Sequence, residues 1–158
     1  MISGQAAAPD AWAYEAPRLR LADHLPGAID AAAIAVGRLT ARACETRYGI
    51  TIAEWRMIAL VAETGPAPEL DVLSRSASDQ AHARRTVRSL ARRGLARIAD
   101  RHVSLTPDGE DVYAEIAPLV LAYEATLLTG LSPGEVIALK HLLQRVRSAA
   151  DRLQGLAG

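Results

Sequence analysis

The chain has 158 residues, of which 50% are hydrophobic and 23% charged, and its basic and acidic residues are equal in number. This hydrophobic content excludes a chain that is disordered throughout, and the length suits one domain. Aromatic residues make up only 4% and phenylalanine is absent, so Leu, Ala, Val and Ile must build the core. Because Ala and Leu are good helix formers, the composition favours a mainly α fold.

The sequence lacks the features of membrane proteins, metal proteins and common enzymes. It has neither a run of 18 apolar residues nor a leader segment, so we expect a soluble, cytoplasmic protein. Its four histidines are far apart and its only cysteine is Cys44, so we predict no metal site, no cofactor and no internal disulfide. Nucleophile-elbow, P-loop and glycine-rich phosphate motifs are absent, so we do not expect an enzyme.

The first segment and the first helix differ in hydrophobic periodicity. Residues 1–16 have no sustained pattern, and we expect a flexible tail ahead of one folded unit at 17–158. A long helix is predicted from Pro26 or Gly27 to Tyr48, because apolar residues recur at helical spacing and a glycine follows.

Two helices are predicted next. Thr51 has the properties of an N-cap, and Glu54 three residues later completes a capping box, which predicts a helix that continues to Gly65. The prolines that follow, ending with Pro68, should open a short helix over 69–76.

A further helix and a hairpin should follow. The helix is predicted over Asp79–Arg93, with Ser78 or Asp79 as its N-cap and a glycine as its stop. Leu95–Ile98 and Val103–Leu105 alternate apolar with polar residues, which predicts a small two-stranded hairpin.

The last two helices share one kind of start. Pro107 and Pro133 each follow a Thr or Ser cap and precede acidic residues, and the helices should end near Leu128 and Leu153. Three helices followed by a hairpin form the winged helix-turn-helix layout. We therefore expect a mainly α fold, a winged helix-turn-helix with a short two-stranded hairpin and a helical dimerisation region from both chain ends.

The zero net charge conceals an asymmetry along the chain. Eight of the 18 basic residues lie between Arg75 and Arg101, where only Asp79 and Asp100 oppose them. The rest of the chain is then acidic overall. Such a block of positive charge is a candidate surface for a polyanion.

The predicted helix over Asp79–Arg93 has two unlike faces. At about 100° per residue, Ala83, Val87 and Leu90 share one side. The opposite side carries a row of arginines with almost no acidic residue between them. A solvated helix usually interleaves the two charges, so the pattern favours a helix placed in the DNA major groove over a merely solvated face.

The start of this helix is predicted to contact base edges, since Arg pairs well with guanine and Gln with adenine. Later arginines, the serines of the preceding turn and the hairpin tip would hold phosphates. The candidate DNA-contacting residues are Ser76, Ser78, Gln80, Ala81, His82, Arg84, Arg85, Arg88, Arg92 and Arg101, and Arg93 is also expected to hold phosphate.

Three stretches follow one another along the chain, namely YGITIAEWRMIALVAETG, DVLSRSASDQAHARRTVRSLARRGL and the LTPDG step. Through them the sequence resembles, from Leu19 to Leu153, the MarR family of bacterial regulators. The resemblance implies a homodimer whose interface is built from 17–49 and 107–158, around a DNA-binding lobe at 50–106. Arg85 matches the arginine that members usually carry in the middle of the recognition helix. The wing here is shorter than is usual in the family.

The resemblance also implies a ligand. Many members are repressors that small phenolic or carboxylate ligands release from DNA, bound between the dimer core and the DNA-binding lobe. Trp55 and Arg56 are our candidates for contacts with a small aromatic or carboxylate effector. The alternatives are that Trp55 packs in the core and that Arg56 forms an ion pair. Cys44 is either a redox switch or, as we favour, a buried inert residue.

The predicted function is that of a sequence-specific DNA-binding transcriptional regulator. We expect a ligand-responsive repressor that acts as a homodimer on a near-palindromic operator. The alternative is a winged-helix module that binds protein or ligand without reading DNA, which the short wing and the zero net charge motivate.

Overall fold

The computed structural model describes residues 20, 24–76 and 79–156. The predicted tail at 1–16 and the candidate residue Ser78 lie outside this part of the chain. The chain divides within its first helix into two units, Met1–Ala35 and Val36–Gly158, and every element after the first helix lies in the second. No helix in the described part has the length and apolar character needed to span a bilayer.

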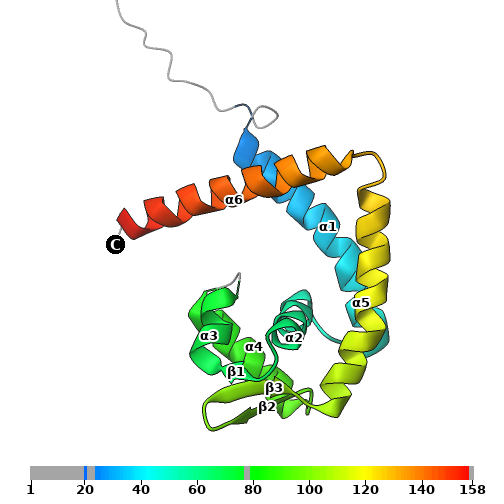
Figure 1. Cartoon of the computed structure of the whole chain (residues 1–158), viewed down its shortest axis with the longest axis vertical. Helices are drawn as coiled ribbons and strands as arrows, with labels where there is room; N and C mark the ends of the chain where they lie inside the picture. The colour runs from blue at the N-terminus through cyan, green and yellow to red at the C-terminus, as the bar shows by residue number, and fades with distance from the viewer. Residues whose placement is uncertain (1–19, 21–23, 77–78, 157–158) are drawn as a thin grey trace, which may run out of the picture. The chain divides into compact units, whose positions relative to one another are not determined.

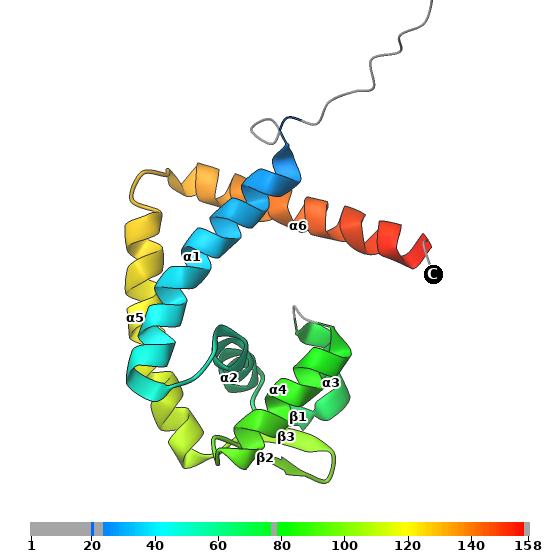
Figure 2. The same ribbon diagram turned by 180° about the vertical axis from the view of Figure 1, so that it is seen from behind.

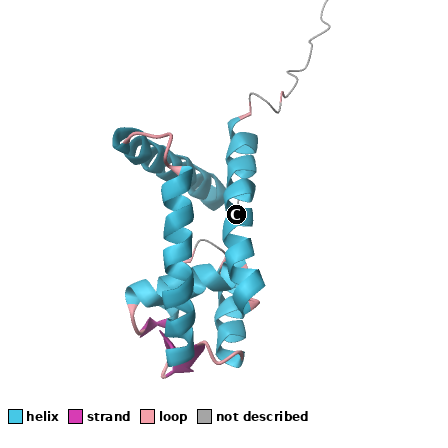
Figure 3. Ribbon diagram, turned by 90° about the vertical axis from the view of Figure 1, so that its right-hand side faces the viewer, coloured by secondary structure: helices cyan, strands magenta, loops and turns pink. Residues whose placement is uncertain are grey.

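The order of elements agrees with the sequence-based expectation, apart from one additional strand (Figure 1). In chain order the elements are α1 (Leu25–Tyr48), α2 (Ile52–Thr64), β1 (Ala67–Pro68), α3 (Glu69–Arg75), α4 (Gln80–Arg92), β2 (Ala96–Ala99), β3 (His102–Leu105), α5 (Pro107–Leu127) and α6 (Pro133–Leu156). The strands occupy one small region, and the other described elements are helices (Figure 3).

Capping residues set the helix starts as predicted. The Thr51 hydroxyl accepts the backbone N–H of Glu54 at 3.2 Å, and the Glu54 carboxylate accepts the backbone N–H of Thr51 at 2.9 Å. Ser132 and Glu135 form the same reciprocal pair at the start of α6. These caps satisfy N–H groups that the first helical turn leaves without a partner.

The sheet has three strands in the order β1-β3-β2, so the prediction of only two strands was incomplete. Ala67 pairs with Val103 and Pro68 with His102. Strand β1 is too short to show the alternation of apolar and polar residues that predicts a strand. Its second residue, Pro68, also precedes α3, so the sequence indicates only the start of that helix. Proline is tolerated there because β1 is an edge strand, where a missing N–H breaks no inner ladder.

The core lies between α2, α3, α4, the sheet and the first half of α5, which pack on one another. Its fully buried side chains are aliphatic, as the composition predicted. They include Ile58 of α2, Val72 of α3, Leu90 of α4, Val103 of β3 and Ile116 of α5. The view from behind shows α4 alongside α3, as a helix-turn-helix requires (Figure 2).

The start of α5 is fixed against the turn between α4 and β2. The Thr106 hydroxyl donates to the carbonyl of Gly94 at 2.6 Å and accepts the N–H of Gly109 at 3.2 Å. A Cβ at Gly109 would overlap the carbonyl oxygen of Leu95. This close approach explains why the LTPDG step carries glycine.

Candidate nucleic-acid interface

Helix α4 presents the arginine row outward, as the sequence predicted. Ala83, Val87 and Leu90 on its inner face are fully buried. On the outer face Ala81, Arg84, Arg85, Arg88 and Arg92 are exposed. Arg88 and Arg92 form no hydrogen bond or ion pair with any residue that the structure describes, so both are available to a ligand.

The N-terminus of α4 is capped by Asp79. The Asp79 carboxylate accepts the backbone N–H of His82 at 2.8 Å. That hydrogen bond, aided by the nearby charge of Arg85, lowers the pKa of Asp79, although slight desolvation opposes them. Gln80 is exposed in the first turn and His82 is half-buried. The cap fixes where the helix begins.

Arg84 differs from the rest of the row because it pairs with the protein. Its Nε atom lies 3.4 Å from a carboxylate oxygen of Glu69 at the start of α3, and 45% of its side chain is exposed. Arg84 therefore reaches along the surface towards α3, while Arg85 and Arg88 form no such ion pair among the described residues.

The turn before α4 and the hairpin tip flank the row. Ser76 is the C-cap that follows α3, and its N–H donates to the carbonyls of Val72 and Leu73. The hairpin tip is Asp100-Arg101, and both residues have positive φ, 49° and 60°. Such φ values are typical of a two-residue turn that matches the strand twist. Arg101 is exposed, and its carbonyl accepts the N–H of Glu69 at 2.8 Å, which ties the tip to α3.

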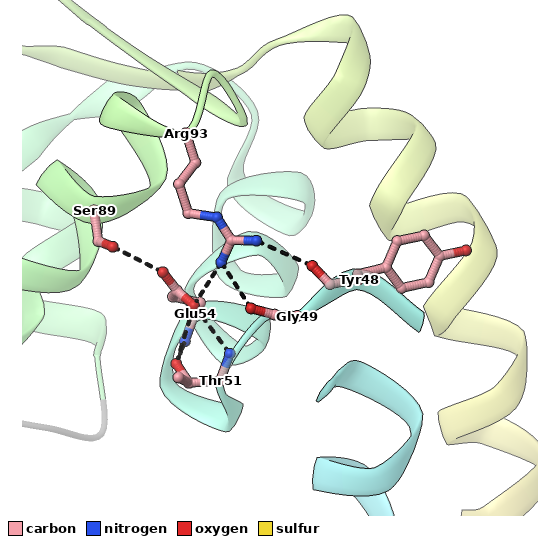
Figure 4. Close-up of polar contacts among 6 residues, drawn as sticks. All are labelled: Tyr48, Gly49, Thr51, Glu54, Ser89 and Arg93. Atoms are coloured by element: carbon pink, nitrogen blue, oxygen red, sulfur yellow. Dashed lines mark hydrogen bonds and ion pairs between the residues drawn. The ribbon is translucent and has the colours of Figure 1, made fainter. Parts of the chain in front are cut away.

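Arg93 is turned inward, so the expectation that it holds phosphate was wrong (Figure 4). Its guanidinium lies 3.0 Å from the Glu54 carboxylate and donates to the carbonyls of Tyr48 and Gly49 at 3.0 and 3.2 Å. Ser89, one turn earlier on α4, donates to the same carboxylate at 2.8 Å. These contacts fasten the C-terminal end of α4 to the α1–α2 turn.

Glu54 thus has two roles, as the capping-box acid of α2 and as the acceptor for α4. Its burial raises the pKa of the carboxyl group, but the hydrogen bonds from Thr51 and Ser89 and the charge of Arg93 together lower it by more. The net pKa lies below the ordinary value of 4.5. The carboxylate is therefore charged at neutral pH and holds its partners.

This lowered pKa predicts a loss of stability in acid. A carboxyl whose folded pKa is depressed stabilises the fold above its unfolded pKa, and that contribution disappears as the pH falls through the folded value. We therefore expect the urea midpoint of the wild type to fall more steeply below about pH 4.5 than that of Glu54→Gln. The control is Glu63→Gln, which changes a side chain that is 70% exposed. The urea midpoint of this control should follow the wild-type pH profile. Equal pH profiles for the wild type and Glu54→Gln would contradict the role of Glu54.

The remaining residues singled out in the sequence are Trp55, Arg56 and Cys44. Trp55 is 6% exposed and its ring stacks on Tyr113 of α5, with centroids 5.9 Å apart. Arg56 is exposed and lines a surface cavity between α2, the end of α3 and the first turns of α4. Cys44 is fully buried, and burial, aided by the Glu45 carboxylate, raises the pKa of its thiol. A raised pKa disfavours the reactive thiolate, as expected for an inert residue.

Comparison with known proteins identifies the fold. No family model and no curated protein matches the sequence. Among solved structures, a MarR/EmrR family transcriptional regulator from Acinetobacter sp. ADP1 is 20% identical, with a TM-score of 0.75 over 85% of this chain and 99% of that one. A probable transcriptional regulator from Pseudomonas aeruginosa is 27% identical, with a TM-score of 0.70 over 80% of this chain and 99% of that one.

A third structure concerns regulation by a ligand. Bordetella bronchiseptica BpsR, whose DNA binding is regulated by 6-hydroxynicotinic acid, is 22% identical, with a TM-score of 0.72 over 83% of this chain and 98% of that one. By their names, the structures given above are transcriptional regulators or proteins with regulated DNA binding. The chain has the fold of the MarR-family transcriptional regulators, a winged helix-turn-helix with long helices at both ends.

Proposed function

We propose that this protein is a transcriptional regulator that binds double-stranded DNA through α4. The observation that carries the proposal is the row of outward arginines on a helix whose inner face is fully buried. A helix of this kind fits the major groove, where Arg85 would donate to guanine O6 and N7. A regulator of bacterial DNA would act in the cytoplasm.

The other contacts are expected to orient the helix. Gln80, Ala81 and His82 lie in the first turn of α4, where the helix would meet base edges. Arg88 and Arg92 lie farther along and would bind phosphates, as would Ser76 and the tip residue Arg101. Ser78 and Arg84 are also proposed DNA contacts. Arg84 would give up its ion pair with Glu69 when it binds DNA.

Phosphate contact by Arg92 predicts a particular change in salt dependence. We expect Arg92→Ala to weaken binding alike on all duplexes and to reduce the slope of log affinity against log salt by about 1, because one fewer counterion is released. The measurement is a fluorescence-anisotropy titration at several salt concentrations. Arg145→Ala, at an exposed arginine of α6, should keep the wild-type slope. An unchanged slope for Arg92→Ala would show that this side chain does not touch phosphate.

The regulator is proposed to act as a homodimer on a near-palindromic operator. Several apolar side chains of α6 are 41–53% exposed in the single chain, namely Leu139, Leu142, Leu143 and Val146. A contiguous apolar face of this kind is typical of a surface that a second subunit covers. The segments proposed for the interface are 17–49 and 107–158, around the lobe at 50–106.

Dimerisation through α6 predicts that a charge there is disruptive. We expect Leu142→Asp to raise the dimer dissociation constant by on the order of 100-fold or more, because two symmetric copies each lose a buried leucine. Light scattering after gel filtration measures the mass directly. Gln144→Asp, on the opposite side of α6, is the matched control. A Leu142→Asp protein that remains dimeric at low micromolar concentration would contradict this interface.

Repression and ligand response complete the proposal. BpsR, whose DNA binding is regulated by 6-hydroxynicotinic acid, supports a ligand-responsive regulator with this fold.

The alternative function is a module that does not read DNA, and the short two-residue hairpin tip motivates it. Heparin and random-sequence duplex DNA distinguish the two, since both should bind at low salt only if the arginine row is a polyanion surface. If neither binds, the alternative holds.

A further inference from the structure

A surface hollow of about 520 Å³ lies beside the tip of the hairpin. Its walls come from β1 and the start of α3, from α4 and from the hairpin. They carry Arg84 of α4, Arg101 and His102 of the hairpin, and the two acids Glu69 and Asp100. We call this site the tip hollow. Because its two arginines come from different elements, an anion placed in the hollow would be bordered by both.

The tip hollow lies within the proposed DNA surface. Arg84 and Arg101 are both exposed, and both are proposed DNA contacts. The phosphates of a duplex border its grooves, so a duplex that contacts α4 and the hairpin tip together brings part of its backbone over the hollow. A phosphate is therefore the group that Arg84 and Arg101 would meet there.

In the free protein an acidic side chain already engages one of these arginines. A carboxylate oxygen of Glu69 lies 3.4 Å from Nε of Arg84, and 24% of the Glu69 side chain is exposed. The backbone N–H of Glu69 donates to the carbonyl of Arg101 at 2.8 Å, which fastens the start of α3 to the hairpin tip. This hydrogen bond holds Glu69 at the wall of the hollow, beside Arg84.

The ion pair between Glu69 and Arg84 is weak enough to be exchanged. Its separation of 3.4 Å exceeds the distance of about 2.7–2.9 Å that is typical of hydrogen bonds between charged groups. In addition, 45% of the Arg84 side chain is exposed, and ion pairs as exposed as this contribute little to stability. A phosphate of DNA can therefore replace Glu69 as the partner of Arg84 at low cost.

The Glu69 carboxylate nevertheless opposes DNA binding in two ways. It competes for Arg84 before the duplex arrives, and afterwards its negative charge lies next to the phosphate, where like charges repel. Because every duplex has the same backbone, this opposition does not depend on sequence. Asp100, the other acid of the hollow, forms no ion pair with any residue that the structure describes. Of these two acids, Glu69 can therefore act through Arg84, whereas Asp100 acts by its charge alone.

We propose that Glu69 is an internal competitor of DNA phosphate, which holds Arg84 in the free protein and so limits the affinity of the regulator for all DNA. This role rests on the proposed function and adds a residue that sets the affinity of the same surface. In the wild type, contacts with base edges must accordingly supply more of the binding free energy. Removal of the carboxylate should leave Arg84 and Arg101 both free to bind the backbone.

Affinity for random-sequence duplex DNA tests this role on the full chain. We expect Glu69→Gln to bind this duplex about fivefold more tightly than the wild type does. A duplex that the protein selects from a random pool should be bound more tightly by the same factor, because the backbone contact is common to both. Fluorescence anisotropy at one fixed salt concentration measures both affinities. A wild-type affinity of Glu69→Gln for random duplex would overturn the proposal.

A double substitution shows whether Glu69 acts through Arg84. In an Arg84→Ala background, Glu69→Gln should change the affinity by less than about twofold, because no guanidinium remains to be released. The matched control is Asp100→Asn, which removes the other negative charge of the hollow. Its gain in affinity should be the same with and without Arg84. Asparagine also tolerates the positive φ of this position.

The possible failures are distinguishable. Glutamine keeps the backbone N–H that the Arg101 carbonyl accepts, so Glu69→Gln should unfold at nearly the wild-type urea concentration. If the gain from Glu69→Gln is equally large with and without Arg84, competition for Arg84 is overturned while the DNA regulator stands. If neither the wild type nor any variant binds duplex DNA, the proposed function fails, and the role of Glu69 fails with it.

Discussion

We expect Arg93→Met to lower the free energy of unfolding by about 2 kcal/mol. Hydrogen bonds to charged groups contribute roughly 1.5–3 kcal/mol each. Arg93 makes three such contacts, but its side chain is 34% exposed, so solvent replaces part of what is lost. The Glu54 carboxylate, 9% exposed, would keep Ser89 and Thr51 as its partners among the described residues. Methionine retains the apolar stem, so the change reports mainly on the charge.

Urea unfolding at one fixed protein concentration measures this effect. The matched control is Arg92→Met, at the exposed neighbouring arginine, which should unfold like the wild type. For DNA affinity the order should be reversed. Arg92→Met should bind DNA more weakly than Arg93→Met, because Arg92 is the proposed phosphate contact. If Arg93→Met and Arg92→Met unfold at the same urea concentration, the contacts of Arg93 do not stabilise the fold.

We expect Arg85→Ala to weaken binding to a duplex that the protein selects from a random pool (the selected duplex) by about 1–3 kcal/mol, roughly 5- to 150-fold. A bidentate contact to guanine discriminates between bases, so affinity for random duplex should fall much less. The ratio of specific to random affinity is therefore the quantity to compare. Because Arg85 is exposed and pairs with no described carboxylate within 4 Å, its removal should leave stability almost unchanged.

Arg85→Lys separates charge from geometry. Lysine keeps the positive charge but lacks the planar fork of donors, so most of the specificity should still be lost. A lysine variant with full specificity would show that Arg85 acts only as a charge. An alanine variant that loses affinity equally on all sequences would place Arg85 on phosphate instead of a base edge.

Most of the fold could be predicted from local signals. The capping box of Thr51 and Glu54, the Asp79 cap and the prolines at the starts of α5 and α6 each mark a boundary that depends on neighbouring residues alone. The strand Ala67–Pro68 could not be predicted, because its pairing with β3 is made by residues far away in sequence.

The candidate site was predicted less completely. The outward row of α4 follows from periodicity, but the inward turn of Arg93 depends on Glu54, 39 residues away. A signal was present, since at about 100° per residue Arg93 lies only about 60° from the buried Leu90. The cavity beside α4 had no sequence signal beyond Arg56, because three helices close it.

The central claim is that the arginine row of α4 docks in the major groove. Methylation protection of guanine N7, an atom that faces this groove, tests it on the selected duplex. We predict two protected segments about one helical turn, roughly 10 base pairs, apart, with one protected guanine in each segment lost in Arg85→Ala. A duplex that the protein binds while every guanine N7 remains reactive would contradict the account.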